Sequence, residues 1–340
     1  MNGFGSELLR IVGRSVGRIA GGIAGGISLL AGLCCTGSAL AQAYPSKPVR
    51  IVVAFPPGGA ADVLVRTLAP KLGEQLGQPV LVENRPGASG TIGVAYVAKA
   101  APDGYTLICG STPTISVAPH VYHSLPYQPL KDLIPISRLA MIPSLLVTHP
   151  SVPVANVREL IALLKAQPGK FAYGSAGAGS TQHLSGEQFK LMTGVELVHI
   201  PYKGGAPMMA DLIGGQIALS FEPVNTATSQ VRSGKIKALA VTTASRLASQ
   251  PELATVAETL PGFELAIWFG LMAPTGTPRE INARLESETI RALRNPEIRD
   301  RMTAQGGEII ADTSEEFAAT LRKEFVTWAD FAKRTGMKLD

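Results

Sequence analysis

The sequence predicts an α/β fold of two domains, each a mostly parallel sheet flanked by helices. Short apolar, β-branched runs alternate with helical patterns along the chain, which is typical of parallel strands covered by helices on both faces. The length of 340 residues accommodates two domains. Proline-rich stretches near positions 143 and 264 offer crossing points. Residues 44–143 and 265–340 would then form the first domain, and residues 144–264 the second.

The first expected unit is a strand, a tight turn and a helix. Residues 49–55 form a β-branched run that stops at Pro56, after which leucines recur every four residues from Leu64 to Leu76. Two strand-like runs, 134–140 and 144–149, are separated by Pro143. Further strands are expected at 80–83, 105–109, 171–175, 196–200, 217–221 and 236–241, with a helix through Lys99 and a C-terminal helix ending near Thr335.

Residues 1–41 are expected to be a cleaved secretory signal. A stretch with three arginines precedes an uncharged apolar stretch at 19–35, and residues 39–41 supply a small-x-small cleavage pattern. An uncleaved membrane anchor is the alternative. Cleavage would leave Cys109 as the only cysteine, so the mature chain could form no intramolecular disulfide.

Composition argues against several classes of function. Charged residues make up 17% of the chain and the net charge is +5, without a basic run that resembles a nucleic-acid-binding stripe. The dinucleotide fingerprint G-x-G-x-x-G and the phosphate-loop motif are absent from the first glycine-rich turn, and the five histidines lack metal-ligand spacing. We therefore expect no nucleic acid, no cofactor and no metal.

Glycine-rich turns follow several expected strands and precede helices. Residues 55–62, 173–183 and 201–207 share this design, which offers backbone N–H groups and a helix N-terminus to an anion. Few of their side chains are charged, so the pattern favours a small carboxylate. Asp62 could instead be a first-turn partner of the helix, and Glu222 could meet a ligand ammonium or lie in a solvated turn.

A secreted hydrolase or isomerase that uses Ser180 and His183 is an alternative of another class. These residues are three apart on an expected helix and could touch. The nucleophile-elbow pattern G-x-S-x-G is not present around Ser175, and no third group that would orient the imidazole is evident. We therefore expect a binding protein and no enzyme.

Six ordered motifs resemble those of the periplasmic Bug proteins, the solute-binding components of tripartite tricarboxylate transporters. The likeness covers essentially the whole chain from Tyr44 to the C-terminal helix. The motifs are Tyr44-Pro45-Ser46-Lys47-Pro48-Val49-Arg50, Phe55-Pro56-Pro57-Gly58-Gly59, Glu83-Asn84-Arg85-Pro86-Gly87-Ala88, Pro102-Asp103-Gly104-Tyr105-Thr106-Leu107, Tyr173-Gly174-Ser175-Ala176-Gly177 and Pro201-Tyr202-Lys203-Gly204-Gly205-Ala206-Pro207.

This resemblance implies a two-domain periplasmic-binding-protein fold, type II-like, that closes over a small carboxylate in the cleft between the domains. One wall of the cleft would be formed by Phe55, Gly58, Gly59, Asp62, Ser89, Ser111 and Thr112. The other wall would be formed by Ser175, Gly177, Ser180, Thr181, His183, Gly205 and Ala206. Many relatives have aspartate where Glu222 stands, so the longer side chain would change the reach of the pocket.

The resemblance also implies a role and partners. A periplasmic monomer would capture a di- or tricarboxylate, an acidic amino acid or an aromatic carboxylate, and deliver it to the membrane components of a tripartite tricarboxylate transporter. The same fold could instead present its closed form to a membrane sensor kinase.

Overall fold

The computed structural model describes residues 44–304 and 306–339. The chain divides into two compact units, residues 1–46 and 47–340, and the second unit holds every helix and strand described below. The predicted signal at residues 1–41, with its cleavage site, lies outside the described residues. Among those that are described, no helix has both the length and the apolar character needed to cross a membrane.

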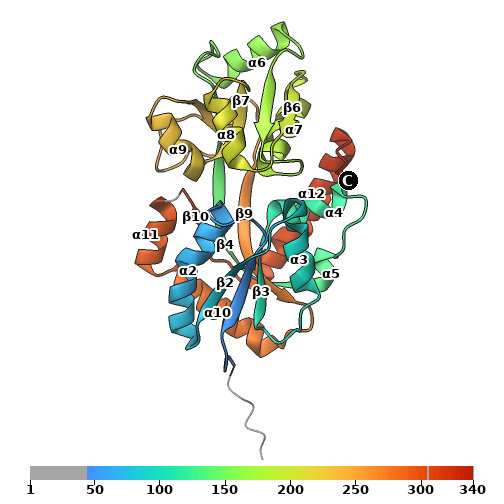
Figure 1. The fold of residues 1–340 in the computed structure, drawn as a ribbon, viewed down its shortest axis with the longest axis vertical. Helices are drawn as coiled ribbons and strands as arrows, with labels where there is room; N and C mark the ends of the chain where they lie inside the picture. The colour runs from blue at the N-terminus through green and yellow to red at the C-terminus, as the bar shows by residue number, and fades with distance from the viewer. Residues whose placement is uncertain (1–43, 305, 340) are drawn as a thin grey trace, which may run out of the picture. The chain divides into compact units, whose positions relative to one another are not determined.

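Strands and helices alternate through most of the chain, as predicted (Figure 1). The strands are β1 (Val49–Val53), β2 (Val80–Asn84), β3 (Thr106–Ser111), β4 (Leu133–Thr148), β5 (Ala172–Ser175), β6 (Val198–Pro201), β7 (Leu219–Pro223), β8 (Lys237–Val241), β9 (Ala266–Pro274) and β10 (Glu308–Ile309). The helices are α2 (Ala60–Leu76), α3 (Thr91–Ala98), α4 (Ala118–Val121), α5 (Pro129–Asp132), α6 (Val157–Ala166), α7 (Thr181–Thr193), α8 (Gly205–Ile213), α9 (Val224–Arg232), α10 (Arg279–Leu293), α11 (Pro296–Ala304) and α12 (Ser314–Thr335). Short helical turns are η1 (Ala88–Gly90), η2 (Thr112–Val117) and η3 (Val256–Glu258).

The strands form a sheet in the order β2-β1-β3-β9-β4-β7-β5-β6, with β8 and β10 also paired to β4. The sheet contains a group of parallel strands at each end. In the first group β1 pairs in parallel with β2 and β3, and in the second group β5 pairs in parallel with β6 and β7. The predicted α/β fold class is thus confirmed. The sequence pattern did not predict that the connecting strands β4 and β9 run antiparallel to their neighbours.

Strand β4 joins the two groups of strands (Figure 1). It pairs with β9 as far as Pro143, and from Ser144 onward it pairs with β7 and β8. The expectation of two strands separated by Pro143 was therefore wrong, since residues 133–148 are one strand. A proline lacks the N–H that a sheet needs, and it is tolerated here because the pairing partner changes at this position.

The regularly spaced leucines of helix α2 form its buried face. Leu64, Leu68, Leu72 and Leu76 are buried at four-residue intervals, and the helix ends at the left-handed Gly77. Separate apolar clusters form beneath the two groups of strands, one centred on Val52, Ile108 and Phe317 and others around Phe221 and Met208. The loops at the carboxyl ends of the parallel strands are thus held by packed sheets.

Candidate functional site

The loop after β1 is held by Asp62. Its carboxylate, which is 3% exposed, accepts hydrogen bonds from Gly58 N–H (2.9 Å), Asn84 Nδ2 (2.8 Å) and Arg66 Nε (2.9 Å). Burial raises the pKa of Asp62, but the bonds from Arg66, Gly58 and Asn84 outweigh it and leave the pKa below its usual value. Gly59 begins α2 without a side-chain cap, so the first-turn N–H groups stay available.

The predicted residues of this first wall lie close to one another. Phe55, after β1, packs beside Gly90. A Cβ on Gly90 would lie only 3.2 Å from the Phe55 ring and 2.7 Å from the side chain of Thr114. Gly90 has a φ of 94°, so a side chain there would be strained as well as crowded. The loops after β1, β2 and β3 therefore converge.

The hydroxyls of Ser111 and Thr112 are engaged inside this wall. Ser111 Oγ lies 3.2 Å from Thr114 Oγ1, and Thr112 Oγ1 accepts a bond from Trp268 N–H (3.2 Å). Both residues are buried. They hold the turn into η2 in place, and their direct contact with a ligand stays a prediction.

In the second group of strands, Ser175 ties the glycine loop to a histidine. Its Oγ lies 2.7 Å from His199 Nε2, and it donates to Gly177 O (3.1 Å) and accepts from Gly177 N–H (3.2 Å). His183 Nδ1 accepts from Gly179 N–H (3.0 Å), which places the proton of a neutral ring on Nε2. The loop between β5 and α7 is therefore fixed at both ends.

The two imidazoles stack, with ring centroids 4.0 Å apart and planes within 10°. Tyr173 also stacks on His199, with ring centroids 4.8 Å apart. Burial lowers the pKa of His183, and burial together with the neighbouring imidazole lowers the pKa of His199 to about 4. Both rings are thus neutral near pH 7 and supply no positive charge to the site.

Ser180 stands at the N-terminus of α7 without capping it. The residue precedes the helix, yet its side chain makes no cap bond, and its buried Oγ has no hydrogen-bond partner among the described residues. Thr181 follows as the first residue of the helix and is 8% exposed. Because buried hydroxyls in native proteins are almost always paired, the free Oγ beside uncapped N–H groups is a place for a ligand oxygen or a water.

The third glycine loop leads into α8. Gly204, with a φ of 115°, precedes the helix without a side-chain cap, and Gly205 and Ala206 form its first turn. A Cβ on Gly205 would meet no atom within 4 Å. Tyr202 N–H donates to Ser175 O (3.0 Å), which joins this loop to the one between β5 and α7.

Glu222 is the fourth of the five residues of β7 and is only 2% exposed. Gln182 Nε2 and Ser220 Oγ lie 3.2 Å from its Oε1, and Thr226 Oγ1 lies 3.2 Å from its Oε2. In the described part of the chain it has no ion-pair partner. Burial raises the pKa of Glu222 to about 7 despite these three neutral hydrogen bonds.

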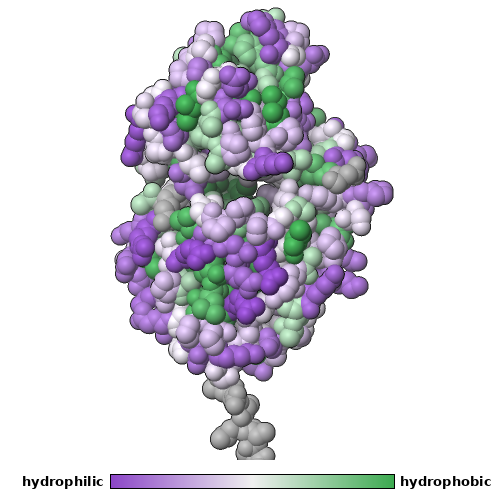
Figure 2. Space-filling model, in the orientation of Figure 1, coloured by the Kyte–Doolittle hydropathy of each residue, from purple (hydrophilic) through white to green (hydrophobic). Residues whose placement is uncertain are grey.

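One hydrogen bond joins the two predicted walls. Ser89, in a left-handed conformation with a φ of 51°, donates from Oγ to Ala178 O at 3.0 Å. The side chain of Leu339 packs beside Gly179, because a Cβ on Gly179 would lie only 2.6 Å from it. Figure 2 shows the surface of residues 47–340 hollowed between the part that carries α8 and α9 and the part that carries α2 and α3.

The structure thus brings the predicted residues together in two groups. Phe55, Gly58, Gly59 and Asp62 belong to the first group, with Ser111 and Thr112 beside them, and Ser175, Gly177, Ser180, Thr181, His183, Gly205, Ala206 and Glu222 belong to the second. Ser89 reaches from the first to the second.

Sequence reasoning missed four polar residues of the second group. His199 lies under the glycine loop, and Gln182, Ser220 and Thr226 surround Glu222. His199 could have been found from its place near the end of β6, directly before the third glycine loop. The other three are isolated polar residues whose partners are set only by the packing of α7 and α9 against β7.

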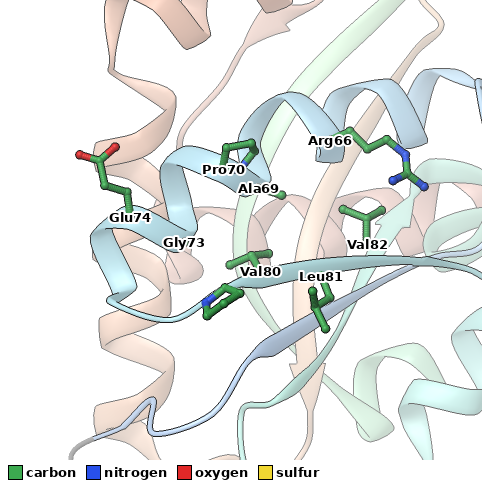
Figure 3. A pocket seen from close by; sticks show the side chains of 9 residues that line it. Arg66, Ala69, Pro70, Gly73, Glu74, Val80, Leu81 and Val82 are labelled. Carbon is green, nitrogen blue, oxygen red and sulfur yellow. The ribbon is translucent and has the colours of Figure 1, made fainter.

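A surface groove of about 760 Å³ lies elsewhere, between α2 and β2 (Figure 3). It is lined by Arg66, Ala69, Pro70, Gly73, Glu74, Pro79, Val80, Leu81 and Val82. Its two charged groups already have partners, Asp62 for Arg66 and Lys71 for Glu74. The groove contains none of the predicted site residues. Across the described residues, no group of three potential metal ligands gathers.

Comparison with known proteins gives consistent matches. The family model described as "Tripartite tricarboxylate transporter family receptor" matches residues 64–337. Protein BugT of Bordetella pertussis is 38% identical over 301 residues, which cover 88% of this chain and 92% of BugT.

Two solved structures of relatives contain dicarboxylates. The R. palustris protein Rpa4515 with adipate is 37% identical, with a TM-score of 0.81 over 87% of this chain and 99% of that one. MatC (Rpa3494) from Rhodopseudomonas palustris, with bound malate, is 32% identical, with a TM-score of 0.78 over 85% of this chain and 99% of that one.

Proposed function

This chain belongs to the tripartite tricarboxylate transporter receptor family, and from this premise we propose that it is a periplasmic binding protein for a small dicarboxylate. Residues 44–143 and 265–340 form one domain, and residues 144–264 form the other. The protein captures the ligand in the cleft between these domains and delivers it to the membrane components of such a transporter. It is exported by a signal at residues 1–41. The adipate and malate in the relatives' structures support the ligand class.

The observation that carries the proposal is the free end of α7. Ser180 Oγ is buried without a partner among the described residues, next to helix N–H groups that no side chain caps. Helix N-termini favour anions through these N–H groups and the helix dipole. The neutral His183 and His199 leave this role to N–H groups and hydroxyls.

The same geometry does not favour the hydrolase alternative. His183 Nδ1 is occupied by Gly179 N–H, and Ser180 Oγ makes no bond to His183 or to any other described residue. A serine nucleophile requires a base within hydrogen-bond reach. Binding without catalysis therefore accounts for more of the site. The expected monomeric state stays a prediction.

Replacing Ser180 with alanine tests the proposal. The mature protein should gain thermal stability with adipate or malate, because a ligand that binds only the native state stabilises it. Ser180→Ala should weaken that binding by roughly 10- to 100-fold, as expected for the loss of a hydrogen bond to a charged group. The unliganded variant should unfold at the wild-type temperature, because this hydroxyl makes no bond to lose.

Ser185→Ala is the matched control. Ser185 lies on the same helix, is fully buried, and its Oγ likewise has no partner among the described residues. It stands more than one turn from the helix N-terminus, so its removal should leave ligand affinity unchanged. Equal affinities for wild type, Ser180→Ala and Ser185→Ala would contradict the placement of the anion. Absence of any thermal shift over a broad carboxylate panel would contradict the function.

A further inference from the structure

The hydrogen bonds around Glu222 have fewer protons than contacts if its carboxyl group is ionised. Ser220 Oγ lies 3.0 Å from Gly174 O and 3.2 Å from Glu222 Oε1. Thr226 Oγ1 lies 2.9 Å from Pro223 O and 3.2 Å from Glu222 Oε2. Each hydroxyl has a single proton, and in both cases the backbone carbonyl is the nearer acceptor.

Protonation of Glu222 satisfies one more contact of this network. With the carboxylate ionised, the two hydroxyl protons and one N–H of Gln182 must serve five contacts. A proton on Oε2 can be donated to Thr226 Oγ1 while Thr226 donates to Pro223 O, so a fourth contact is made. Glu222 has no ion-pair partner among the residues that the structure describes, so burial of its charged form would also be costly.

Glu222 lies directly behind the anion-binding loop of the proposed function. Gln182, which donates to Glu222, is the second residue of α7, next to Ser180 and Thr181. On the other side, Ser220 bonds to Gly174 O, one residue before Ser175. A negative charge on Glu222 would therefore face the same loop as the ligand carboxylate, in surroundings of low dielectric constant.

We infer that Glu222 is held as a neutral carboxylic acid behind the α7 loop, and that capture of a carboxylate by this loop is linked to the Glu222 proton. The inference rests on the proposed function. Bound anion disfavours the ionised form of Glu222, and by reciprocity ionised Glu222 weakens anion binding. The ligand is thus held more tightly when Glu222 is protonated than at alkaline pH.

The elements packed against β7 carry few other charged or titratable groups. The titratable and charged groups of α7, β5, β4 and α9 are His183, Glu187, Lys190, Tyr173, Arg138 and Arg232. Glu187 pairs with Lys190, and Arg138 pairs with Asp312. Burial lowers the pKa of His183 and raises that of Tyr173, which favours the neutral form of both side chains.

Binding of adipate and malate should be measured from pH 6 to 8.5. The wild-type affinity should fall by about fivefold or more over this range, with a slope of at most tenfold per pH unit for one linked proton. Glu222→Gln, which keeps the shape and mimics the neutral acid, should bind with an affinity that does not change with pH. Glu196→Gln removes an exposed carboxylate from the loop before β6 and should retain the wild-type slope.

Calorimetry of the wild type in buffers of different ionisation enthalpy gives a second reading that needs no variant. Near pH 7.5, binding should be accompanied by uptake of a fraction of a proton. No uptake, a pH-independent wild-type affinity, or the same slope in Glu222→Gln would each overturn the inference while leaving the proposed function intact.

The stability of the unliganded protein tests the proton on Glu222 separately from the proposed carboxylate binding. Because the folded-state pKa of Glu222 is raised to about 7, its contribution to stability is present below the ordinary carboxyl pKa of about 4.3 and is lost as the pH rises through 7. Wild-type Tm should therefore fall over this range relative to Glu222→Gln. If no carboxylate binds at any pH, the proposed function and the linkage both fail. Parallel Tm curves would show that Glu222 does not hold the proton.

Discussion

The carboxylate of Asp62 has its oxygens engaged within the first wall. Gly58 N–H, Asn84 Nδ2 and Arg66 Nε all bind it, and Asn84 Nδ2 also donates to Phe55 O. These bonds join the loop after β1 to the end of β2. The side chain therefore supports the shape of the loop, and its direct contact with a ligand stays a prediction.

Asp62→Asn should lower the free energy of unfolding by roughly 1–3 kcal/mol at pH 7, because buried donors lose a charged acceptor. The folded-state pKa of Asp62 is depressed, so its contribution is present above the ordinary value near 3.9 and is lost as the pH falls through the folded-state pKa. Denaturant unfolding at pH 7 and at pH 3 would show the difference between variant and wild type shrinking.

Asp330→Asn provides the control for Asp62→Asn. Asp330 also has an arginine four residues away, Arg334, but both side chains are more than half exposed. Such a pair contributes about 0.5 kcal/mol or less. If Asp62→Asn were as mild as Asp330→Asn at pH 7, the assignment of Asp62 to the support of the loop would be wrong.

At the scale of elements, the segment after α12 bridges α4 and α7. Leu339 N–H donates to Val121 O (2.7 Å), and its side chain packs with Leu184 of α7 in one apolar cluster. The same side chain touches Gly179, whose φ of 76° a larger residue would adopt with strain. The C-terminal segment thus presses on the loop that precedes α7.

Leu339→Ala should destabilise the protein by about 2 kcal/mol or more, since the leucine is 7% exposed and fills a packed cluster. It should also weaken adipate and malate binding, because the loop beside Gly179 loses its support. Val326→Ala on α12, where the side chain is 73% exposed, should change stability by about 0.5 kcal/mol or less. If Leu339→Ala is destabilised but binds adipate and malate with unchanged affinity, the segment after α12 stabilises the fold without supporting the binding loop.

At the scale of the whole molecule, the periodicity of strands and helices was enough to predict the α/β class and the bounds of most strands to within two or three residues. The continuity of β4 through Pro143 was not predictable, because the change of partner that makes this proline acceptable is a property of the sheet. Among site residues, glycine and hydroxyl loops were visible in the sequence. The cage around Glu222 was not, since Gln182 and Thr226 meet it only after α7 and α9 have packed.

Thr242 ties together the two strands that connect the proposed domains. Its Oγ1 accepts from Ser144 N–H (3.1 Å) and donates to Leu265 O (2.6 Å). Ser144 and Leu265 are the residues at which the proposed domain boundaries fall. This arrangement supports a hinge in which both connections move together.

Ser89→Ala tests the contact that spans the cleft. The Ser89 hydroxyl bonds to Ala178 O, and the residue is exposed, so its removal should leave the stability of the unliganded protein unchanged. In the proposed closed state, loss of this bond should raise the ligand dissociation rate by roughly 2- to 10-fold. Stopped-flow dissociation of adipate or malate measures this rate. Ser287→Ala, whose hydroxyl donates to Arg284 O within α10, should leave it unchanged. An unaltered rate in Ser89→Ala would mean that this bond does not limit opening.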